Sequence, residues 1–476
     1  MTKVGIIGSG FAGIGVAIEL RRAGVTDVTL LEKAAELGGV WRENTYPGAA
    51  CDIPSPLYSF SYEPHRTWPR RYSTQAEIHD YLRATAKKYG IDEHIRYNTE
   101  VTAAEWDGRW RVATASGDTF EFDVLIPAVG QLSRPAMPDI PGTDTFQGHS
   151  FHSARWDHDH DLSGRRVAVI GTGASAIQFV PRIQPLVRSL TLFQRTAPYL
   201  LPRLDRQYRW WHHELFRRVP PVQSAGRGGI WAVCELLTKG LVGNQAIART
   251  VQRTALTFLT IQVKDRALRE KLTPDYPAGC KRILFATDYY PTLARPNVHL
   301  ETTGIAEITP RGVRTVDGAV HEADTIIYGT GFDTTDFLAP LHIRGRTGRD
   351  LRADAWAEGA RAYLGISVPE FPNLFLMYGP NTNLGAGSII YMIERQARYI
   401  ARLVRAMRPG QAIEVRADVA ERFDDEMRQR LAGTVWTSCG SWYRTASGRV
   451  VSNWPGLVAE YDRRTKTADM GSYVLT

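Results

Sequence analysis

VGIIGSGFAG, residues 4–13, opens the chain as a short apolar run followed by three closely spaced glycines. The spacing of Gly8, Gly10 and Gly13 is typical of a turn between a β-strand and an α-helix that binds a dinucleotide. The first glycine permits a tight turn, the second lets a pyrophosphate approach the backbone, and the third lets the helix pack close to the strand. The phosphates then lie at the helix N-terminus, where free N–H groups favour anions. We therefore predict a nucleotide site at the start of the chain.

The same pattern occurs a second time, as GTGASA at residues 171–176, after the apolar run 167–170. In each copy a further apolar run ends in a polar residue, Glu32 in the first and Arg195 in the second. A carboxylate at this place hydrogen-bonds a ribose diol, whereas a guanidinium suits a 2′-phosphate. We therefore expect FAD at the first turn and NADPH at the second. The alternative is two ordinary strand–helix turns in a large α/β protein.

A length of 476 residues predicts two or three domains. The apolar runs 123–130 and 324–331 share their outline, and alternating segments precede both, so the second nucleotide domain repeats the plan of the first. We expect an α/β fold with two Rossmann-like dinucleotide-binding domains, for FAD and NADPH, and a helical insertion. The expected parts are residues 1–140 (FAD-binding domain, first part), 141–200 (linker and start of the NADPH-binding domain), 201–280 (helical insertion), 281–335 (NADPH-binding domain, second part) and 336–476 (FAD-binding domain, second part, with a substrate-side C-terminal segment).

Composition excludes several other classes of protein. The net charge of +8 comes with no run of lysine and arginine and no RNA-binding signature, so we expect no nucleic-acid partner. No apolar stretch reaches the roughly 18 residues of a membrane helix. The first apolar residues form the strand of the glycine turn, so we identify no signal peptide. These features predict a cytoplasmic protein with no membrane partner.

Neither the cysteines nor the histidines predict a metal site. The cysteines lie far apart and form no C-x-x-C pair, so we expect reduced thiols and no dithiol reductase. His149, His158 and His160 alternate with aspartates in a pattern that suits a solvated loop better than a metal cluster. The four cysteines are Cys51, Cys234, Cys280 and Cys439.

Two longer motifs carry a resemblance to a known family. Residues 146–157 read FQGHSFHSARWD, which fits F-x-G-x-x-x-H-x-x-x-W-D, and residues 38–52 read GGVWRENTYPGAACD. Both are similar to signatures of the type I Baeyer–Villiger monooxygenases, and the resemblance covers nearly the whole chain in the right order. The ending Trp156-Asp157 favours this group over related flavin enzymes that oxidise nitrogen or sulfur. The family's fingerprint residues correspond here to Phe146, Gly148, His152, Trp156 and Asp157.

The resemblance implies a reaction and the residues for it. Such an enzyme reduces FAD with NADPH, forms a C4a-peroxyflavin with O2, and inserts one oxygen atom beside a ketone carbonyl to give an ester or lactone. A peroxide anion and the adduct's oxyanion both need a fixed cation. The resemblance assigns this role to Arg282, with Asp52 as its counter-charge, and places Lys281 at the NADPH 2′-phosphate.

Further residues take supporting roles in this interpretation. His152 and Trp156 lie in the interdomain linker, so we expect them to couple cofactor binding to domain position. Trp442 and Tyr443 are expected on the substrate side. The predicted cofactor-binding residues are Gly8, Gly10, Phe11, Ala12, Gly13, Glu32, Lys33, Gly39, Val40, Trp41, Asp52, Val101, Gly130, Gly171, Thr172, Gly173, Ala174, Ser175, Arg195, Thr196, Lys281 and Asn381.

Two other functions remain alternatives at this point. One is a flavin-containing N- or S-monooxygenase on the same scaffold, which uses a protonated hydroperoxide and tolerates loss of the arginine. The other is a dinucleotide-binding redox protein that makes no oxygenated product. The expected partners of the favoured function are a ketone and O2.

Overall fold

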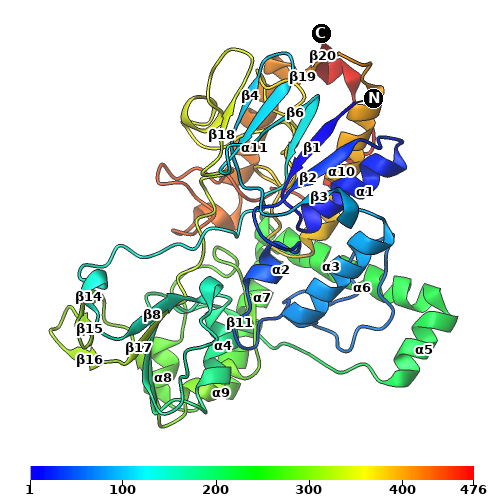
Figure 1. Ribbon diagram of the computed structural model, residues 1–476. Helices are drawn as coiled ribbons and strands as arrows, with labels where there is room; N and C mark the ends of the chain where they lie inside the picture. The colour runs from blue at the N-terminus through cyan, green and yellow to red at the C-terminus, as the bar shows by residue number, and fades with distance from the viewer. Residues whose placement is uncertain (1) are drawn as a thin grey trace.

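Two parallel β-sheets, one in each half of the molecule, organise the computed structural model, which describes residues 2–476 (Figure 1). The first sheet has the strand order β3-β2-β1-β7 and the second the order β13-β10-β9-β17-β8. The first contains β1 (Val4–Ile7), β2 (Val28–Leu31), β3 (Ile95–Arg96) and β7 (Val124–Pro127). The second contains β8 (His149–His152), β9 (Arg166–Ile170), β10 (Ser189–Phe193), β13 (Val298–Glu301) and β17 (Thr325–Tyr328).

Each parallel sheet contains the strand–turn–helix unit that its glycine turn predicts. In the first half, β1 leads through residues 8–10 into α1 (Phe11–Arg22), and α10 (Ile389–Ala406) packs along α1. In the second, β9 leads into α4 (Ala176–Ile183), with α9 (Tyr289–Leu293) packed against it. The helix predicted from residue 75 is α3 (Gln75–Lys88), and its capping box of Thr74 and Glu77 is present.

An antiparallel sheet accompanies each parallel one, as the repeated outline predicts. The other elements are short or C-terminal: α2 (Val40–Glu43), α11 (Ala417–Ala432) and α12 (Val458–Thr465), and the paired strands β11 (Leu200–Leu201) with β12 (Leu284–Phe285) and β19 (Ile413–Val415) with β20 (Tyr473–Leu475). In the first half, β4 (Val101–Trp106), β5 (Trp110–Thr114) and β6 (Thr119–Phe122) pair antiparallel, and β18 (His342–Arg344) joins β4 in parallel at the edge. In the second half, the antiparallel sheet contains β14 (Ile305–Thr309), β15 (Gly312–Thr315) and β16 (Val320–Glu322).

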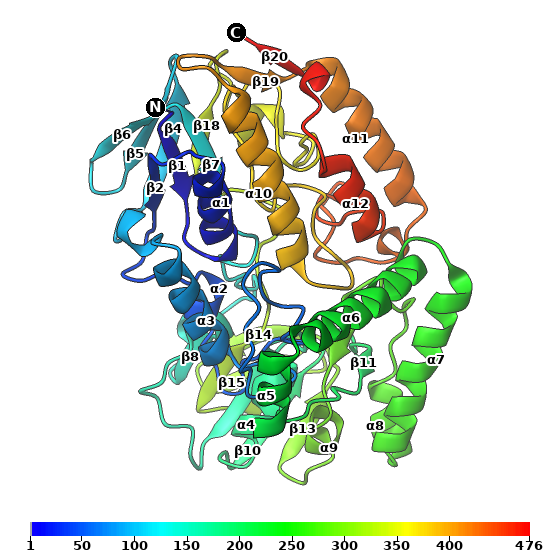
Figure 2. The ribbon, with the colours of Figure 1, turned by 90° about the vertical axis from the view of Figure 1, so that its right-hand side faces the viewer.

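Helices fill the region predicted as an insertion, and they bind to both halves. Ile230 and Trp231 of α6 pack on the core of the first half, and Glu235 of α6 accepts backbone hydrogen bonds from the start of α12. Leu259 of α7 is buried in the core of the second half. Figure 2 shows α6 crossing between the halves. The helices are α5 (Trp210–Arg218), α6 (Pro220–Leu241), α7 (Gln245–Gln262) and α8 (Arg266–Lys271).

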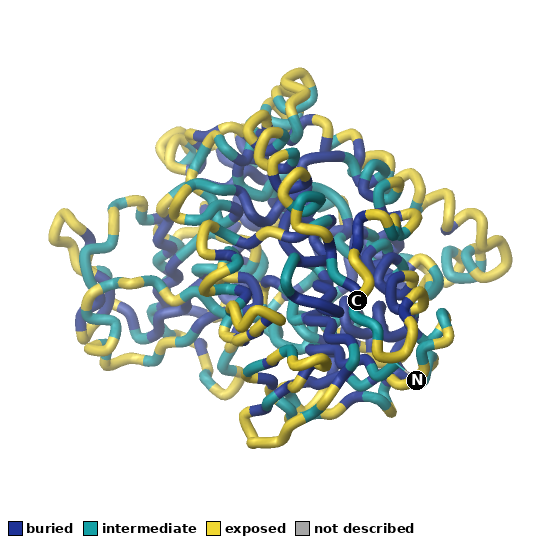
Figure 3. The backbone as a smooth tube through the Cα atoms, turned by 90° about the horizontal axis from the view of Figure 1, so that it is seen from above, coloured by how far each residue is buried: buried dark blue, intermediate teal, exposed yellow. Residues whose placement is uncertain are grey.

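The sheets and helices confirm the predicted α/β fold. Buried residues run through the middle of both halves, and exposed ones lie on peripheral loops and helices (Figure 3). None of the helices within residues 2–476 is long and apolar enough to cross a membrane.

The expectation of reduced thiols is wrong for two of the cysteines. Cys280 and Cys439 form a disulfide, with their Cα atoms 6.1 Å apart, while Cys51 and Cys234 are free. The two half-cystines are 159 residues apart, so their sequence spacing carries no signal of the pairing. They meet because the loop before Lys281 packs against the segment near Val435 in one small apolar cluster.

Loss of this disulfide should destabilise the protein. We expect Cys439→Ser to lower the free energy of unfolding by about 2–4 kcal/mol, because the bond restricts a long loop in the unfolded chain. Urea unfolding without reductant measures the change. Cys234→Ser removes a thiol outside any disulfide and should have a much smaller effect. Equal midpoints for Cys439→Ser and the wild type would contradict the bond.

Candidate active site

The turn between β1 and α1 has the backbone that its three glycines predict. Gly8 adopts φ +102°, a left-handed conformation that favours glycine. A Cβ on Gly13 would lie 2.0 Å from the carbonyl oxygen of Gly8, so any other residue would push the helix from the strand. A Cβ on Gly10 would meet nothing closer than 3.7 Å, and that neighbour is Gly39. Gly10 and Gly39 therefore lie backbone against backbone, with no side chain between them.

The carboxylate of Glu32 lies beside this turn, where β2 ends. Its Oε2 accepts hydrogen bonds from the Ser9 backbone N–H at 3.0 Å and from the Ser9 hydroxyl at 2.7 Å. Its Oε1 accepts from the Ala34 N–H at 3.0 Å and pairs with Arg42 at 3.1 Å. The side chain is buried, so these partners offset the cost of burying its charge.

Near the second turn, Lys281 contacts the Thr196 hydroxyl and lies close enough to Arg195 to feel its charge. Lys281 Nζ donates to Thr196 Oγ1 at 2.7 Å, and Thr172 Oγ1 donates to the Thr196 carbonyl at 3.1 Å. Burial and the nearby positive charge of Arg195 both lower the pKa of Lys281. Lys281 and Arg195 thus place two positive charges beside this turn, and the carboxylate of Asp275 partly offsets their effect on Lys281. Gly171, with φ +107°, opens this turn as Gly8 opens the first.

Arg282 and Asp52 form a bidentate ion pair between the two halves of the molecule. Arg282 Nη2 lies 2.8 Å from Asp52 Oδ2 and 3.0 Å from Oδ1, and Nε lies 3.0 Å from Oδ2. The side chains are 25% and 22% exposed. The charge of Asp52 raises the pKa of Arg282 above its usual value, although burial opposes the rise. A permanently charged, partly dehydrated guanidinium is thus fixed at one place.

This pair lines an apolar cavity of about 170 Å³. Helix α6 supplies Val233, Cys234 and Leu237, and α7 supplies Ala248 and Val251. These wall residues were not predicted individually, because apolar positions on an amphipathic helix do not reveal what they face. The remaining wall comes from loops that include Ile53, Ala278 and Ala386, and from Phe285 of β12.

Tyr443 lies close to the ion pair, and Trp442 packs beside it with ring centroids 4.2 Å apart. Tyr443 is fully buried and its hydroxyl makes no hydrogen bond. Burial raises its pKa to about 12, and the charge of Arg282 opposes that rise. The structure therefore brings the predicted substrate-side aromatics to the predicted catalytic pair.

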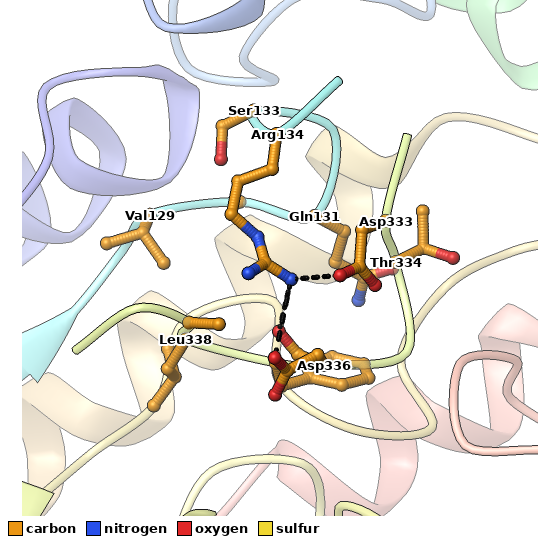
Figure 4. Close-up of a pocket in the computed structure, with 11 residues that line it drawn as sticks. Val129, Gln131, Ser133, Arg134, Asp333, Thr334, Asp336 and Leu338 are labelled. Atoms are coloured by element: carbon orange, nitrogen blue, oxygen red, sulfur yellow. Dashed lines mark hydrogen bonds and ion pairs between the residues drawn. The ribbon is translucent and has the colours of Figure 1, made fainter. Parts of the chain in front are cut away.

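The two connections between the halves run side by side. The Ala136 N–H donates to the Gly331 carbonyl at 2.9 Å, and the Asp333 N–H donates to the Arg134 carbonyl at 3.0 Å. Figure 4 shows the Arg134 side chain directed at Asp333 and Asp336. Arg134 Nη2 lies 2.5 Å from Asp333 Oδ2 and 3.6 Å from Asp336 Oδ2. The predicted cofactor residue Gly130 lines the small pocket at this crossing.

The fingerprint residues lie next to these connections. His152 is buried against Phe332, with ring centroids 5.9 Å apart. Burial lowers the pKa of His152, and a backbone hydrogen bond with Gly331 partly offsets the change. Trp156 packs on Phe179 of α4. The other members lie nearby: Gly148 is held between the Phe146 ring and the backbone of Asp324, and Asp157 pairs with His149 at 2.8 Å.

Other predicted cofactor residues are more dispersed. Trp41 donates to the Tyr58 hydroxyl at 3.1 Å, while Lys33 is exposed and Val101 is buried in β4. Asn381 adopts φ +55° and donates from its amide to two backbone carbonyls, those of Val450 and Asn453. Three others lie at the starts of helices: Ala12 is the second residue of α1, Val40 is the first residue of α2, and Ser175 directly precedes α4.

The comparisons with known proteins agree with this geometry. The chain is 45% identical to a Baeyer–Villiger monooxygenase of Streptomyces coelicolor, over 99% of this chain and 92% of the relative. A Baeyer–Villiger monooxygenase of Pseudomonas aeruginosa is 44% identical, over 100% and 91%. The chain belongs to the Baeyer–Villiger monooxygenase family. Residues 5–199 also match the family described as pyridine nucleotide-disulphide oxidoreductase.

Solved structures of Baeyer–Villiger and related monooxygenases share the fold over the whole chain. An oxidised steroid monooxygenase bound to NADP is 30% identical, with a TM-score of 0.88 over 100% of this chain and 99% of that one. OTEMO in complex with FAD and NADP is 29% identical, with the same TM-score and coverage. A closed crystal structure of cyclohexanone monooxygenase is 28% identical, again with a TM-score of 0.88 and the same coverage.

Proposed function

We propose that Arg282, held by Asp52 beside the apolar cavity, is the catalytic cation of an FAD- and NADPH-dependent Baeyer–Villiger oxidation. The observation that carries this proposal is the bidentate Arg282–Asp52 pair in the cavity lining. The reaction inserts one oxygen atom of O2 next to a ketone carbonyl and gives an ester or lactone. Because the walls are mainly apolar, the favoured substrates are ketones with apolar substituents.

The first turn fits FAD. Gly10 and Gly39 leave backbone free of side chains where a pyrophosphate would lie, and Gly8 and Gly13 hold that backbone in place. Glu32 is the group for the ribose diol, and a ribose would replace either the Ser9 hydroxyl or Arg42 among its present partners. When bound and reduced, FAD supplies activated oxygen from O2.

The second turn fits NADPH. Arg195, Thr196 and Lys281 present two cations and a hydroxyl to a 2′-phosphate, and the turn at Gly171 holds the pyrophosphate. Lys281 and Arg282 are consecutive, so one loop serves both the cofactor phosphate and the catalytic pair.

Arg282 stabilises negative charge where it develops. Its guanidinium stays protonated, and the two oxygens of Asp52 fix the orientation of its plane. The N–H groups that do not bind Asp52 therefore point in fixed directions. In a water-poor cavity such donors stabilise the oxyanion of an attacked carbonyl far more than they would in water. Asp52 is a positioning residue in this scheme, because it acts through Arg282.

The domain assignments and the fingerprint roles complete the proposal. Residues 1–140 and 336–476 serve FAD, residues 141–200 and 281–335 serve NADPH, and the helices of 201–280 supply substrate-cavity walls. His152 and Trp156 transmit the state of the NADPH half to the paired connections, a role that the contact of His152 with Phe332 supports. The Cys280–Cys439 disulfide argues against the predicted cytoplasmic location, because the reducing cytosol disfavours such bonds.

Product analysis tests the function itself. The protein is incubated with NADPH, ¹⁸O2 and a panel of linear, cyclic and aryl ketones plus a thioether, and products are identified by mass spectrometry. We expect one labelled oxygen in an ester or lactone. Label confined to sulfoxide, with every ketone unchanged, would move the protein to the heteroatom-oxidising group.

Arg282→Ala should separate the two halves of the catalytic cycle. We expect NADPH to reduce the flavin at nearly the wild-type rate, while ester formation falls by roughly 100-fold or more, as when a preorganised charge donor is removed. Stopped-flow flavin bleaching and product yield measure the two steps. Arg346→Ala, which removes an exposed arginine paired with Glu414, is the matched control. Substantial ester formation by Arg282→Ala would sink the assignment.

Two glycine variants should separate folding from flavin binding. Gly10→Ala has room in the protein alone, so we expect a normal melting temperature in the flavin-free form but weak FAD binding. Gly13→Ala meets the Gly8 carbonyl and should lower the melting temperature as well. Thermal unfolding of flavin-free protein and flavin retention after reconstitution are compared. Normal FAD affinity in Gly10→Ala would contradict the site.

Arg195→Ala should change which nicotinamide cofactor the protein prefers. Removing one charged contact worth about 1.5–3 kcal/mol should lower kcat/KM for NADPH by roughly 10- to 100-fold. The value for NADH, which lacks the 2′-phosphate, should stay nearly constant. Steady-state flavin reduction with both cofactors gives the ratio. Equal losses with NADPH and NADH would indicate general damage rather than phosphate recognition.

A further inference from the structure

Two histidines and a glutamate converge at the edge of the second sheet. His299 and Glu301 are two residues apart on β13, so their side chains lie on the same face of that strand. His321 comes from β16, in the antiparallel sheet at the outer side of this half (Figure 1). One nitrogen or carboxylate oxygen from each residue lies within 4.8 Å of the others. None of the three lines the apolar cavity.

The separations of these atoms are long for charge-assisted hydrogen bonds and equal the spacing between two ligands of one metal ion. Glu301 Oε2 lies 3.4 Å from His299 Nε2 and 3.4 Å from His321 Nε2. A charge-assisted hydrogen bond between such atoms is about 2.7–2.9 Å long. By contrast, two ligands about 2.0–2.1 Å from a tetrahedral Zn²⁺ are roughly 3.3–3.4 Å apart. Both separations therefore match edges of a zinc tetrahedron.

A backbone hydrogen bond orients the Glu301 carboxylate before any ion binds. Its Oε1 accepts a hydrogen bond from the Thr303 N–H at 2.7 Å, which leaves Oε2 facing the imidazoles. Hydrogen bonds of this kind fix the direction of a metal-binding carboxylate.

The ring nitrogen Nε2 of His321 lacks a partner, and a bound ion would provide one. Its Nε2 is buried and makes no hydrogen bond, and its ring packs edge-on against Phe193 with centroids 5.3 Å apart. Burying a polar atom without a partner destabilises the folded protein, because the atom loses its hydrogen bonds to water. His299 is 59% exposed, against 17% for His321, so solvent reaches the cluster from one side. That side gives an ion a path in and a place for water.

We propose that His299, Glu301 and His321 bind a divalent transition-metal ion of the zinc type, with water completing the coordination. Two imidazoles and a carboxylate suit Zn²⁺, Ni²⁺ or Cu²⁺, whereas Ca²⁺ and Mg²⁺ prefer oxygen ligands alone. The ion joins β13 to the β15–β16 hairpin. Because the Glu301 carbonyl accepts the Gln194 N–H at 2.8 Å, the ion also braces the strand end next to Arg195.

Zinc binding by the flavin-containing protein tests the proposal. Protein without a polyhistidine tag is treated with a chelator, dialysed and titrated with ZnCl2 in a calorimeter, and its melting temperature is recorded with and without zinc. We expect one zinc ion per chain and a higher melting temperature. His299→Gln, Glu301→Gln and His321→Gln should each weaken binding by roughly 10- to 100-fold or more.

A matched pair elsewhere in the chain provides the control. His342 Nδ1 lies 3.5 Å from Asp350 Oδ2, a similar histidine–carboxylate pair, and neither residue belongs to the triad. His342→Gln should therefore bind zinc as the wild type does. His299 is mostly exposed, so His299→Gln should fold and keep the flavin absorption of the wild type. Its zinc affinity therefore tests the proposal even if His321→Gln unfolds. Unchanged zinc affinity in folded His299→Gln, or no stoichiometric binding by the wild type, would overturn the proposal.

Discussion

The Arg282–Asp52 ion pair is the constraint around which the two halves of the molecule are arranged. Asp52 ends the glycine-rich loop that follows the first nucleotide turn, and Arg282 belongs to the loop that carries Lys281. Burying two charges costs several kcal/mol each, and only close bidentate geometry offsets that cost. The pair therefore forms only when both loops are in place, which ties the shape of the cavity to the relative position of the two sheets.

Other contacts also hold the two halves of the molecule in their relative position. The paired connections at Ala136 and Gly331 limit how the halves move, and α6 contacts the first core while its Glu235 binds the start of α12. The disulfide fixes the residue two positions before Arg282 to the C-terminal segment that carries Trp442 and Tyr443. The guanidinium is thus positioned by charge, by packing and by a covalent bond.

Features set by local sequence could be predicted, and those set by distant contacts could not. The turns at Gly8 and Gly171 and the cap at Thr74 depend on residues within a few positions, so their patterns are visible in the sequence. The pairing of Arg282 with Asp52 came from family resemblance, because no local rule joins residues 230 positions apart. The disulfide and the cavity walls on α6 and α7 depend on how loops and helices meet, which single-sequence patterns do not encode.

The origin of the cavity walls has a consequence for how this protein diversifies. Helices α6 and α7 lie outside both parallel sheets, and neither nucleotide turn includes any of their residues. Val233, Leu237 and Val251 can therefore be exchanged for larger or smaller side chains while the backbone under both nucleotide turns stays the same. Selection for a new substrate acts on these helices, whereas retention of the redox chemistry depends on the nucleotide turns. Substitutions in the cavity wall therefore have little effect on cofactor binding.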